Sequence, residues 1–120
     1  MEREVTQLQY LDWPDHGVPQ DSATFLNFVK NLRKFQSATS GATVIHCSAG
    51  VGRTGVTIAV ETAMSLMEQD LEIDPIHILK EMRRQRAVLI QTPVQFLFLY
   101  SCILEYAKEI DQLDRNKYEL

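Results

Sequence analysis

The feature that most restricts the fold is a glycine-rich segment between a short apolar run and a long apolar stretch. Residues 42–46 are mainly apolar and β-branched, and residues 56–67 are apolar on nearly every side. The first pattern is typical of a buried strand and the second of a central buried helix. The segment between them, 48–55, therefore predicts a tight strand–loop–helix connection inside the protein.

Periodicity predicts the remaining elements. β-branched and aromatic residues over 5–11 indicate a second strand, and apolar residues at helical spacing follow a capping Asp21 or Ser22. Two further helices are expected, one after 74 and one from 92 to about 110. The order of strand, helix, strand and three helices predicts the α/β class, with a mixed sheet flanked by helices. Two strands do not make a stable sheet alone, so the sheet would be incomplete.

Capping residues mark the last two helix starts. Asp74 followed by Pro75 is a cap with proline at the first helical position, and Thr92, Pro93 and Gln95 form the same kind of signal. The helix after Pro75 is expected to bury three apolar side chains, those of Ile76, Leu79 and Met82.

Composition narrows the possible functions. The chain has 120 residues, a formal net charge of −4 and two cysteines. A chain of this charge is a poor partner for nucleic acid, and two cysteines do not form a disulfide framework. No signal-peptide pattern and no apolar run of about eighteen residues are present, so no membrane-spanning segment is expected. We therefore expect a soluble cytoplasmic protein whose thiol is available for chemistry.

The glycine-rich segment has the composition of a phosphate cradle. It reads His46-Cys47-Ser48-Ala49-Gly50-Val51-Gly52-Arg53-Thr54-Gly55. A loop that leads into a helix N-terminus directs backbone N–H groups at one point and attracts anions. Gly50 and Gly52 permit the close approach that a tight loop needs, and the guanidinium of Arg53 matches two phosphate oxygens.

The same field would activate Cys47. A helix N-terminus, amide donors and a nearby guanidinium lower the pKa of a thiol from about 8.5 to roughly 3.5–7.5, which makes it a nucleophilic thiolate at neutral pH. Thr54 is expected to hydrogen-bond the sulfur, and His46 to fix the loop backbone. The alternative is that Cys47 is a small buried apolar residue, which its glycine- and arginine-rich surroundings disfavour.

A dinucleotide-binding loop is a second alternative. Gly50, Gly52 and Gly55 spell G-x-G-x-x-G between a strand and a helix. That spelling is weak alone, and the chain continues with helices rather than another β-α-β unit. A phosphate cradle, which uses both Cys47 and Arg53, therefore explains the loop better than a dinucleotide-binding site does.

Three motifs in order resemble the protein tyrosine phosphatases. The loop from His46 to Gly55 matches that family's signature, residues 13–19 (Trp-Pro-Asp-His-Gly-Val-Pro) match its acid loop, and residues 91–95 (Gln-Thr-Pro-Val-Gln) match its two-glutamine loop. The flanking residues look closest to the non-receptor enzymes of the FERM–PDZ type. The resemblance covers most of the chain and identifies it with the C-terminal half of a catalytic domain.

The resemblance implies a role for each matching residue. Cys47 would be the nucleophile, Asp15 the general acid and Arg53 the transition-state clamp, while Gln95, helped by Gln91, would position the hydrolytic water. Residues implied to bind the substrate are Asp15, Cys47, Ser48, Ala49, Gly50, Val51, Gly52, Arg53, Gln91 and Gln95.

Structural alternatives remain for some of these residues. Asp15 taken alone is a turn residue, and Gln95 belongs to a capping box with Thr92. His16 and His77 are expected at the surface and Cys102 in the core, and no cluster has metal-ligand spacing. No metal or cofactor is therefore expected.

The resemblance also implies an incomplete recognition site, because the family's catalytic domain is longer than this chain. We expect residues 1–110 to be catalytic and 111–120 to be a polar tail. Three functions are open: a phosphatase acting on phosphotyrosine in proteins or peptides, a phosphotyrosine-binding module without turnover, and a cysteine phosphatase of broader specificity. The missing N-terminal half of the domain is an expected partner.

Overall fold

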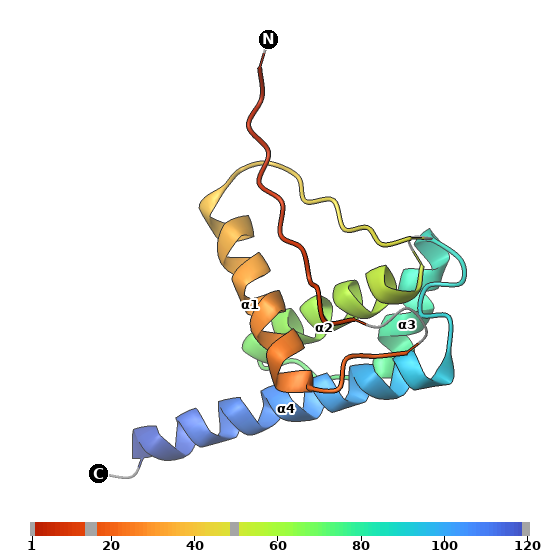
Figure 1. Cartoon of the computed structure of the whole chain (residues 1–120). Coiled ribbons are helices and arrows are strands. Elements are labelled where there is room, and N and C mark those ends of the chain that lie inside the picture. The colour runs from red at the N-terminus through yellow and green to blue at the C-terminus, as the bar shows by residue number, and fades with distance from the viewer. Residues whose placement is uncertain (1, 14–16, 49–50, 119–120) are drawn as a thin grey trace.

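The computed structural model describes residues 2–13, 17–48 and 51–118, with side chains as far as Leu113. Within these ranges it contains α1 (Ser22–Ala38), α2 (Gly52–Glu68), α3 (Pro75–Gln85) and α4 (Pro93–Tyr118). Figure 1 shows the long α4 crossing the molecule, α1 standing on it, and α2 and α3 behind and beside it. Helix α2 packs against the other three helices and is the centre of the fold.

Local capping explains where α1 and α3 begin. The carboxylate of Asp21 accepts from the backbone N–H of Ala23, and that of Asp74 accepts from the N–H groups of Ile76 and His77. These bonds satisfy helix-start donors that have no partner within the helix. The helix starts predicted at Asp21 and at Asp74-Pro75 are confirmed.

The core lies between α2 and its neighbours. Its largest fully buried side chains come from α1, α2, the connection before α4 and α4 itself; they are Phe25, Leu26, Val29, Val56, Val60, Ile90, Leu99 and Cys102. Burial of each large apolar side chain stabilises the folded state by about 1.5–3 kcal/mol. The prediction that 56–67 forms a central buried helix is confirmed.

An aromatic cluster joins the N-terminal segment to α1 and α4. The Trp13 ring packs edge-on against Phe25 and Phe98, with centroids 5.3 and 5.8 Å apart, and Tyr10 packs edge-on against Phe25 at 5.3 Å. Edge-to-face aromatic pairs add to the energy of burial. Trp13 is thereby anchored at the N-terminal side of residues 14–16.

Polar contacts connect the far side of α1 to α2 and α4. Lys30 pairs with Glu109, and Nη2 of Arg33 lies 2.6 Å from a carboxylate oxygen of Glu68. The same carboxylate accepts a 2.9 Å hydrogen bond from the hydroxyl of Tyr106. These contacts fix the three helices at the end of α2 that is remote from its N-terminus.

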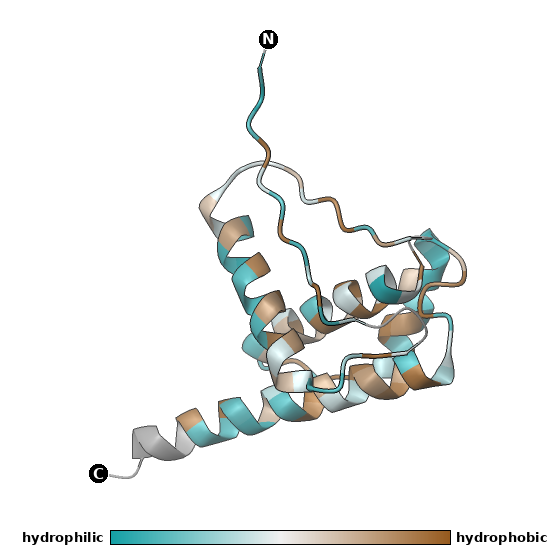
Figure 2. Cartoon of the chain, in the orientation of Figure 1, coloured by the Kyte–Doolittle hydropathy of each residue, from teal (hydrophilic) through white to brown (hydrophobic). Residues whose placement is uncertain are grey.

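The predicted α/β class is wrong, because no strand forms among the residues that the structure describes. Residues 5–11 and 42–46 have extended but unpaired backbones, and Val5 and Val44 are 82% and 83% exposed. Apolar residues are present on both segments (Figure 2). Their β-branched composition favours strands, but a strand needs a hydrogen-bonded neighbour, and neither segment has one.

Two details of the helices also differ from expectation. Helix α4 runs to Tyr118, beyond the predicted end near residue 110. In α3, Ile76 is half exposed, and the buried residues are Ile78 and Met82. Positions 78 and 82 are four apart and share a helix face, so the face that meets α2 is rotated from the one predicted. No described helix is long and apolar enough to cross a membrane.

Candidate active site

The side chains of Cys47 and Thr54 meet at the N-terminal end of α2. The Thr54 hydroxyl donates a 3.1 Å hydrogen bond to Sγ of Cys47. Thr54 is buried in the first turn of α2, whereas Cys47 is half-buried in the preceding loop. A hydroxyl donor favours the charged form of a sulfur, so this contact suits a thiolate.

The start of α2 is suited to an anion. Val51 occupies the N-cap position, and no side chain caps the helix there among the described residues. The first N–H groups of a helix have no partner within it, and the helix dipole favours negative charge at this end. The first turn of α2 therefore has donors suited to phosphoryl oxygens.

Gln91 and Gln95 lie directly against Gly52. A Cβ atom added at Gly52 would be 2.8 Å from Nε2 of Gln95 and 2.9 Å from Oε1 of Gln91. The two glutamines are also joined, since the Gln91 backbone N–H donates to Oε1 of Gln95 at 2.9 Å. The absence of a side chain at Gly52 lets both amides approach the helix start.

Gln95 takes part in a modified capping arrangement. The Thr92 hydroxyl accepts from the Gln95 N–H at 3.2 Å, as expected for a cap. The Gln95 side chain, however, bonds the N–H of Gln91 rather than that of Thr92. Gln95 thus takes part in the cap and also lies against Gly52, so a structural role and a role in the site are compatible for this residue.

The connection between α3 and α4 is hydrogen-bonded to the same loop. The Val51 carbonyl accepts two N–H groups, from Ile90 at 2.9 Å and from Gly55 at 3.1 Å. A Cβ at Gly55 would lie only 2.6 Å from the Ile90 nitrogen. Glycine at position 55 is therefore needed for this close approach of two backbones.

The described residues on either side of 14–16 are also tied together. The indole N–H of the buried Trp13 donates a 2.8 Å hydrogen bond to the Gly17 carbonyl. Asp15, the predicted general acid, lies between them in the sequence but outside the described residues, as does His16. Ala49 and Gly50 of the predicted cradle are outside them too.

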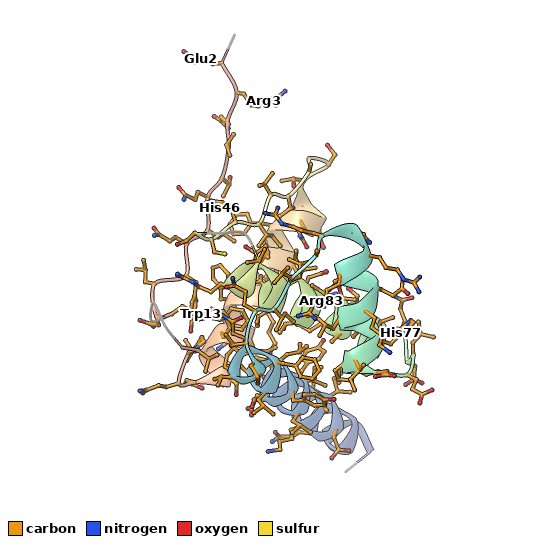
Figure 3. All side chains as sticks on the ribbon, turned by 90° about the vertical axis from the view of Figure 1, so that its right-hand side faces the viewer. Glu2, Arg3, Trp13, His46, His77 and Arg83 are labelled. Carbon is orange, nitrogen blue, oxygen red and sulfur yellow. The ribbon has the colours of Figure 1, made fainter. Side chains whose placement is uncertain are left out.

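The structure brings together only part of the predicted site. Cys47 and Thr54 are in contact, as are Gly52 and the two glutamines, and both groups meet at the start of α2. Arg53 is half-buried there, and its carbonyl accepts from the Thr57 hydroxyl. Ser48 and His46 are exposed (Figure 3 labels His46), and the predicted fixing of the loop by His46 stays a prediction.

The second thiol has a different environment. Cys102 is completely buried in α4, as predicted for a core residue. Burial raises the pKa of Cys102 from 9.0 to about 12, with a smaller contribution from the charge of Glu105. It therefore stays protonated and inert under conditions in which a solvent-accessible thiol reacts.

Two hollows of the described surface lie away from Cys47. One of about 330 Å³ is bordered by the end of α2 and by α4, and one of about 280 Å³ by residues 18–22 and the start of α4. Neither is lined by Cys47 or by the glutamines. Within the described residues, no three His, Cys, Asp or Glu side chains are grouped as metal ligands would be.

The residues that support the glutamines were not predicted. Arg83 lies outside the predicted site, yet its side chain donates hydrogen bonds to two backbone carbonyls beside Gln91. The positive φ angles of Val88 and Ile90 were not expected either. Neither residue is a glycine or asparagine that would mark a left-handed position, so no residue type in this segment signals the conformation.

Comparison with known proteins supports the resemblance. A sequence model described as protein-tyrosine phosphatase matches residues 1–105. Tyrosine-protein phosphatase non-receptor type 4 of Homo sapiens is 50% identical over 107 residues, which cover 89% of this chain and 12% of the relative. Tyrosine-protein phosphatase 1 of Caenorhabditis elegans is 52% identical over 103 residues, covering 86% and 10%.

Receptor enzymes match less closely. Receptor-type tyrosine-protein phosphatase C of Rattus norvegicus is 38% identical over 118 residues, which cover 98% of this chain and 9% of the relative. The chain thus spans about a tenth of the length of these relatives. The higher identity to a non-receptor enzyme agrees with the expected non-receptor type. The chain belongs to the protein-tyrosine phosphatase family.

Proposed function

We propose that this chain carries the catalytic residues of an enzyme that hydrolyses phosphotyrosine in proteins. The observation that carries the proposal is the hydrogen bond from Thr54 to Cys47 Sγ at the start of α2. This arrangement stabilises a thiolate where an anion binds. Membership of the family supports the same chemistry.

In the first step, the Cys47 thiolate attacks phosphorus. A sulfur–phosphorus bond forms and the bond from phosphorus to the tyrosine oxygen breaks. The phenol has a pKa of about 10, so it leaves more easily when it is protonated as it departs. Asp15 is proposed to supply that proton, and the Trp13–Gly17 hydrogen bond provides a fixed base for its segment.

In the second step, water attacks the cysteinyl-phosphate. An oxygen–phosphorus bond forms, the sulfur–phosphorus bond breaks, and the ionised Asp15 accepts the proton of the water. Gln95 and Gln91 are proposed to hold this water, because their amides lie against Gly52. The side-chain bond from Gln95 to the Gln91 N–H would keep the pair in place.

Arg53 and the loop amides are proposed to stabilise the transferring phosphoryl group. Its negative charge spreads over three equatorial oxygens, which suits a planar guanidinium and several N–H donors. Ser48, Ala49, Gly50, Val51 and Gly52 would contribute amides together with Arg53. In the proposed mechanism, these groups stabilise the charge on the phosphoryl oxygens.

The finer assignments are also proposals. We propose a cytoplasmic signalling role, which the identity with a non-receptor enzyme supports. We expect proteins or peptides that carry phosphotyrosine as substrates, and the N-terminal half of the domain as a partner that completes their recognition. The division into a catalytic part over 1–110 and a polar tail over 111–120 stays a prediction.

The test is phosphate release from a phosphotyrosine peptide and from a matched phosphoserine peptide. We expect release from the first at a rate at least about 100-fold higher, with Cys47→Ser abolishing it. Asp15→Ala should slow release by about 10²–10⁴-fold, the usual contribution of a general acid. Arg53→Lys should also slow it, because an ammonium lacks the planar fork.

The outcomes separate the three candidate functions. Binding of the phosphotyrosine peptide without release would favour a binding module. Equal turnover of both peptides would favour a broader phosphatase. Arg84→Met is the matched control, since Arg84 is exposed and pairs with Glu81 on its own helix. Its activity should equal that of the unaltered protein.

A further inference from the structure

The connection from α3 to α4 has an unusual backbone. Val88 and Ile90 have φ angles of 67° and 62°, in the left-handed region that β-branched residues avoid. Leu89 and Ile90 are nonetheless 4% and 2% exposed, so their side chains are anchored in the core. A strained segment persists only when its surroundings fix it, and such strain is common beside functional sites.

Arg83 supplies part of that fixation. Its Nε donates to the Leu89 carbonyl at 3.0 Å, and its Nη2 donates to the Ile90 carbonyl at 2.8 Å. The fork of one guanidinium thus holds two successive carbonyls. In Figure 3, Arg83 and His77 lie on opposite sides of α3, with Arg83 on the side toward the other helices. The adjacent Arg84 is 77% exposed and pairs with Glu81 instead.

The fixed segment is attached to the loop of Cys47. The Ile90 N–H donates to the Val51 carbonyl at the N-cap of α2. Ile90 is followed directly by Gln91, whose own N–H donates to Oε1 of Gln95. Hydrogen bonds therefore connect Arg83, through the backbone of Ile90 and Gln91, to both the start of α2 and the glutamine pair.

We propose that Arg83 is a positioning residue that holds Gln91 and Gln95 against the start of α2 for the hydrolysis of the cysteinyl-phosphate. The inference rests on the proposed function and adds a residue to it. Arg83 does not contact the reacting atoms. It acts by fixing the carbonyls of Leu89 and Ile90, and its loss would affect the water-dependent step more than the attack by Cys47.

The kinetic test uses rapid mixing of the full chain with p-nitrophenyl phosphate. In Arg83→Met, the first turnover should release nitrophenol at close to the rate of the unaltered chain. The steady-state rate that follows should be lower than that of the unaltered chain, by up to about 100-fold. A methionine fills similar space but has no donors. The steady rate of Arg83→Lys, whose ammonium lacks the guanidinium fork, should lie between those of Arg83→Met and the unaltered chain. Arg84→Met should have the same steady rate as the unaltered chain.

A second measurement follows the structure without reference to catalysis. Exchange of the Ile90 amide hydrogen should be at least about tenfold faster in Arg83→Met, while exchange within α1 stays the same. If α1 also exchanges faster, Arg83→Met has loosened the whole fold. Arg83→Lys is then tested in the same way, by comparing exchange of the Ile90 amide with exchange within α1.

The outcomes distinguish the inference from the proposed function. If the unaltered chain releases no phosphate, the proposed function fails, and Ile90 exchange still decides whether Arg83 fixes the segment. Unchanged Ile90 exchange in Arg83→Met overturns the inference whatever the activity. A loss of equal size in the first turnover and in the steady rate also overturns it, as does an equal loss in Arg84→Met.

Discussion

The Thr54 hydroxyl donates a hydrogen bond to the Cys47 sulfur across 3.1 Å, from a buried first turn of α2 to the half-buried loop before it. A donor aimed at sulfur favours the thiolate over the thiol. This contact links the fold of α2 to the reactivity of the proposed nucleophile, and it can be tested without a substrate.

Replacing Thr54 by valine should slow alkylation of Cys47 at neutral pH, because the thiolate loses a donor while the side-chain shape is kept. Thr54→Ser retains the hydroxyl and should react at nearly the unaltered rate. Iodoacetamide labelling followed by peptide mass analysis measures both. Equal rates in all three proteins would show that the hydrogen bond does not influence the sulfur.

The two cysteines should differ widely in reactivity. At pH 8, Cys47 should react with iodoacetamide at least about 100-fold faster than Cys102, because Cys102 is buried and its pKa is about 12. Peroxide should select the same residue. The urea-unfolded chain is the control, in which the difference should largely disappear. Comparable rates in the folded chain would contradict the burial of Cys102.

Gly55→Ala should destabilise the protein by about 2 kcal/mol, the typical cost of forcing extra volume into a packed interior. Its Cβ would meet the backbone nitrogen of Ile90 at 2.6 Å, and a backbone atom cannot swing aside. Gly41→Ala is the control, with nothing within 4 Å of its Cβ, and should change the free energy of unfolding by less than about 0.5 kcal/mol. Urea unfolding measures both. Equal effects would refute the close approach.

Gly52→Ala should behave differently from Gly55→Ala. Its Cβ would meet the ends of the Gln95 and Gln91 side chains, which can rotate away. The free energy of unfolding should therefore change by less than about 1 kcal/mol. Phosphate release should fall by roughly 10–100-fold, because the displaced amides no longer hold the water. Full activity in this variant would remove the basis for placing the glutamines in the site.

Alkaline pH should destabilise the fold through Tyr106 and Cys102. Burial, followed by hydrogen bonding to Glu68, raises the pKa of Tyr106 from 10.0 to about 12. Between these pH values the folded state keeps a proton on Tyr106 that the unfolded state loses. The contribution of Tyr106 to the free energy of unfolding is therefore complete below pH 10 and disappears between pH 10 and 12.

The matched variant for this prediction is Tyr106→Phe. Its free energy of unfolding should decrease less between pH 10 and 11.5, because phenylalanine does not ionise, while the contribution of Cys102 remains. Urea unfolding at several pH values gives both curves. Parallel curves would mean that Tyr106 has the same pKa in the folded and unfolded states.

Sequence patterns predicted the helices well because helix signals are local. The Asp74-Pro75 pair and the spacing of Phe25 and Val29 act within a few residues, and both helix predictions are confirmed. The strands were predicted wrongly because strand formation needs a distant partner. Val5 and Val44 have suitable composition but remain exposed.

The site was partly predictable for the same reason. Cys47 and Thr54 are only seven residues apart, in the loop before α2 and in its first turn, so the sequence indicated their contact. The support from Arg83 spans only six and seven residues, but it depends on the left-handed backbone of Val88 and Ile90, which their residue types do not indicate. The face of α3 was also mistaken, with Ile76 exposed where Ile78 is buried.

The Val51 carbonyl accepts two backbone hydrogen bonds, and this limits how related sequences can diverge. Its oxygen completes the first turn of α2 and also receives the Ile90 N–H. The exposed side chains of residues 86–88 can be exchanged without breaking that bond, because it involves only backbone atoms. Insertion or deletion of one residue there would present a different N–H and shift the following glutamines, so natural variants should vary in composition in this connection while conserving its length.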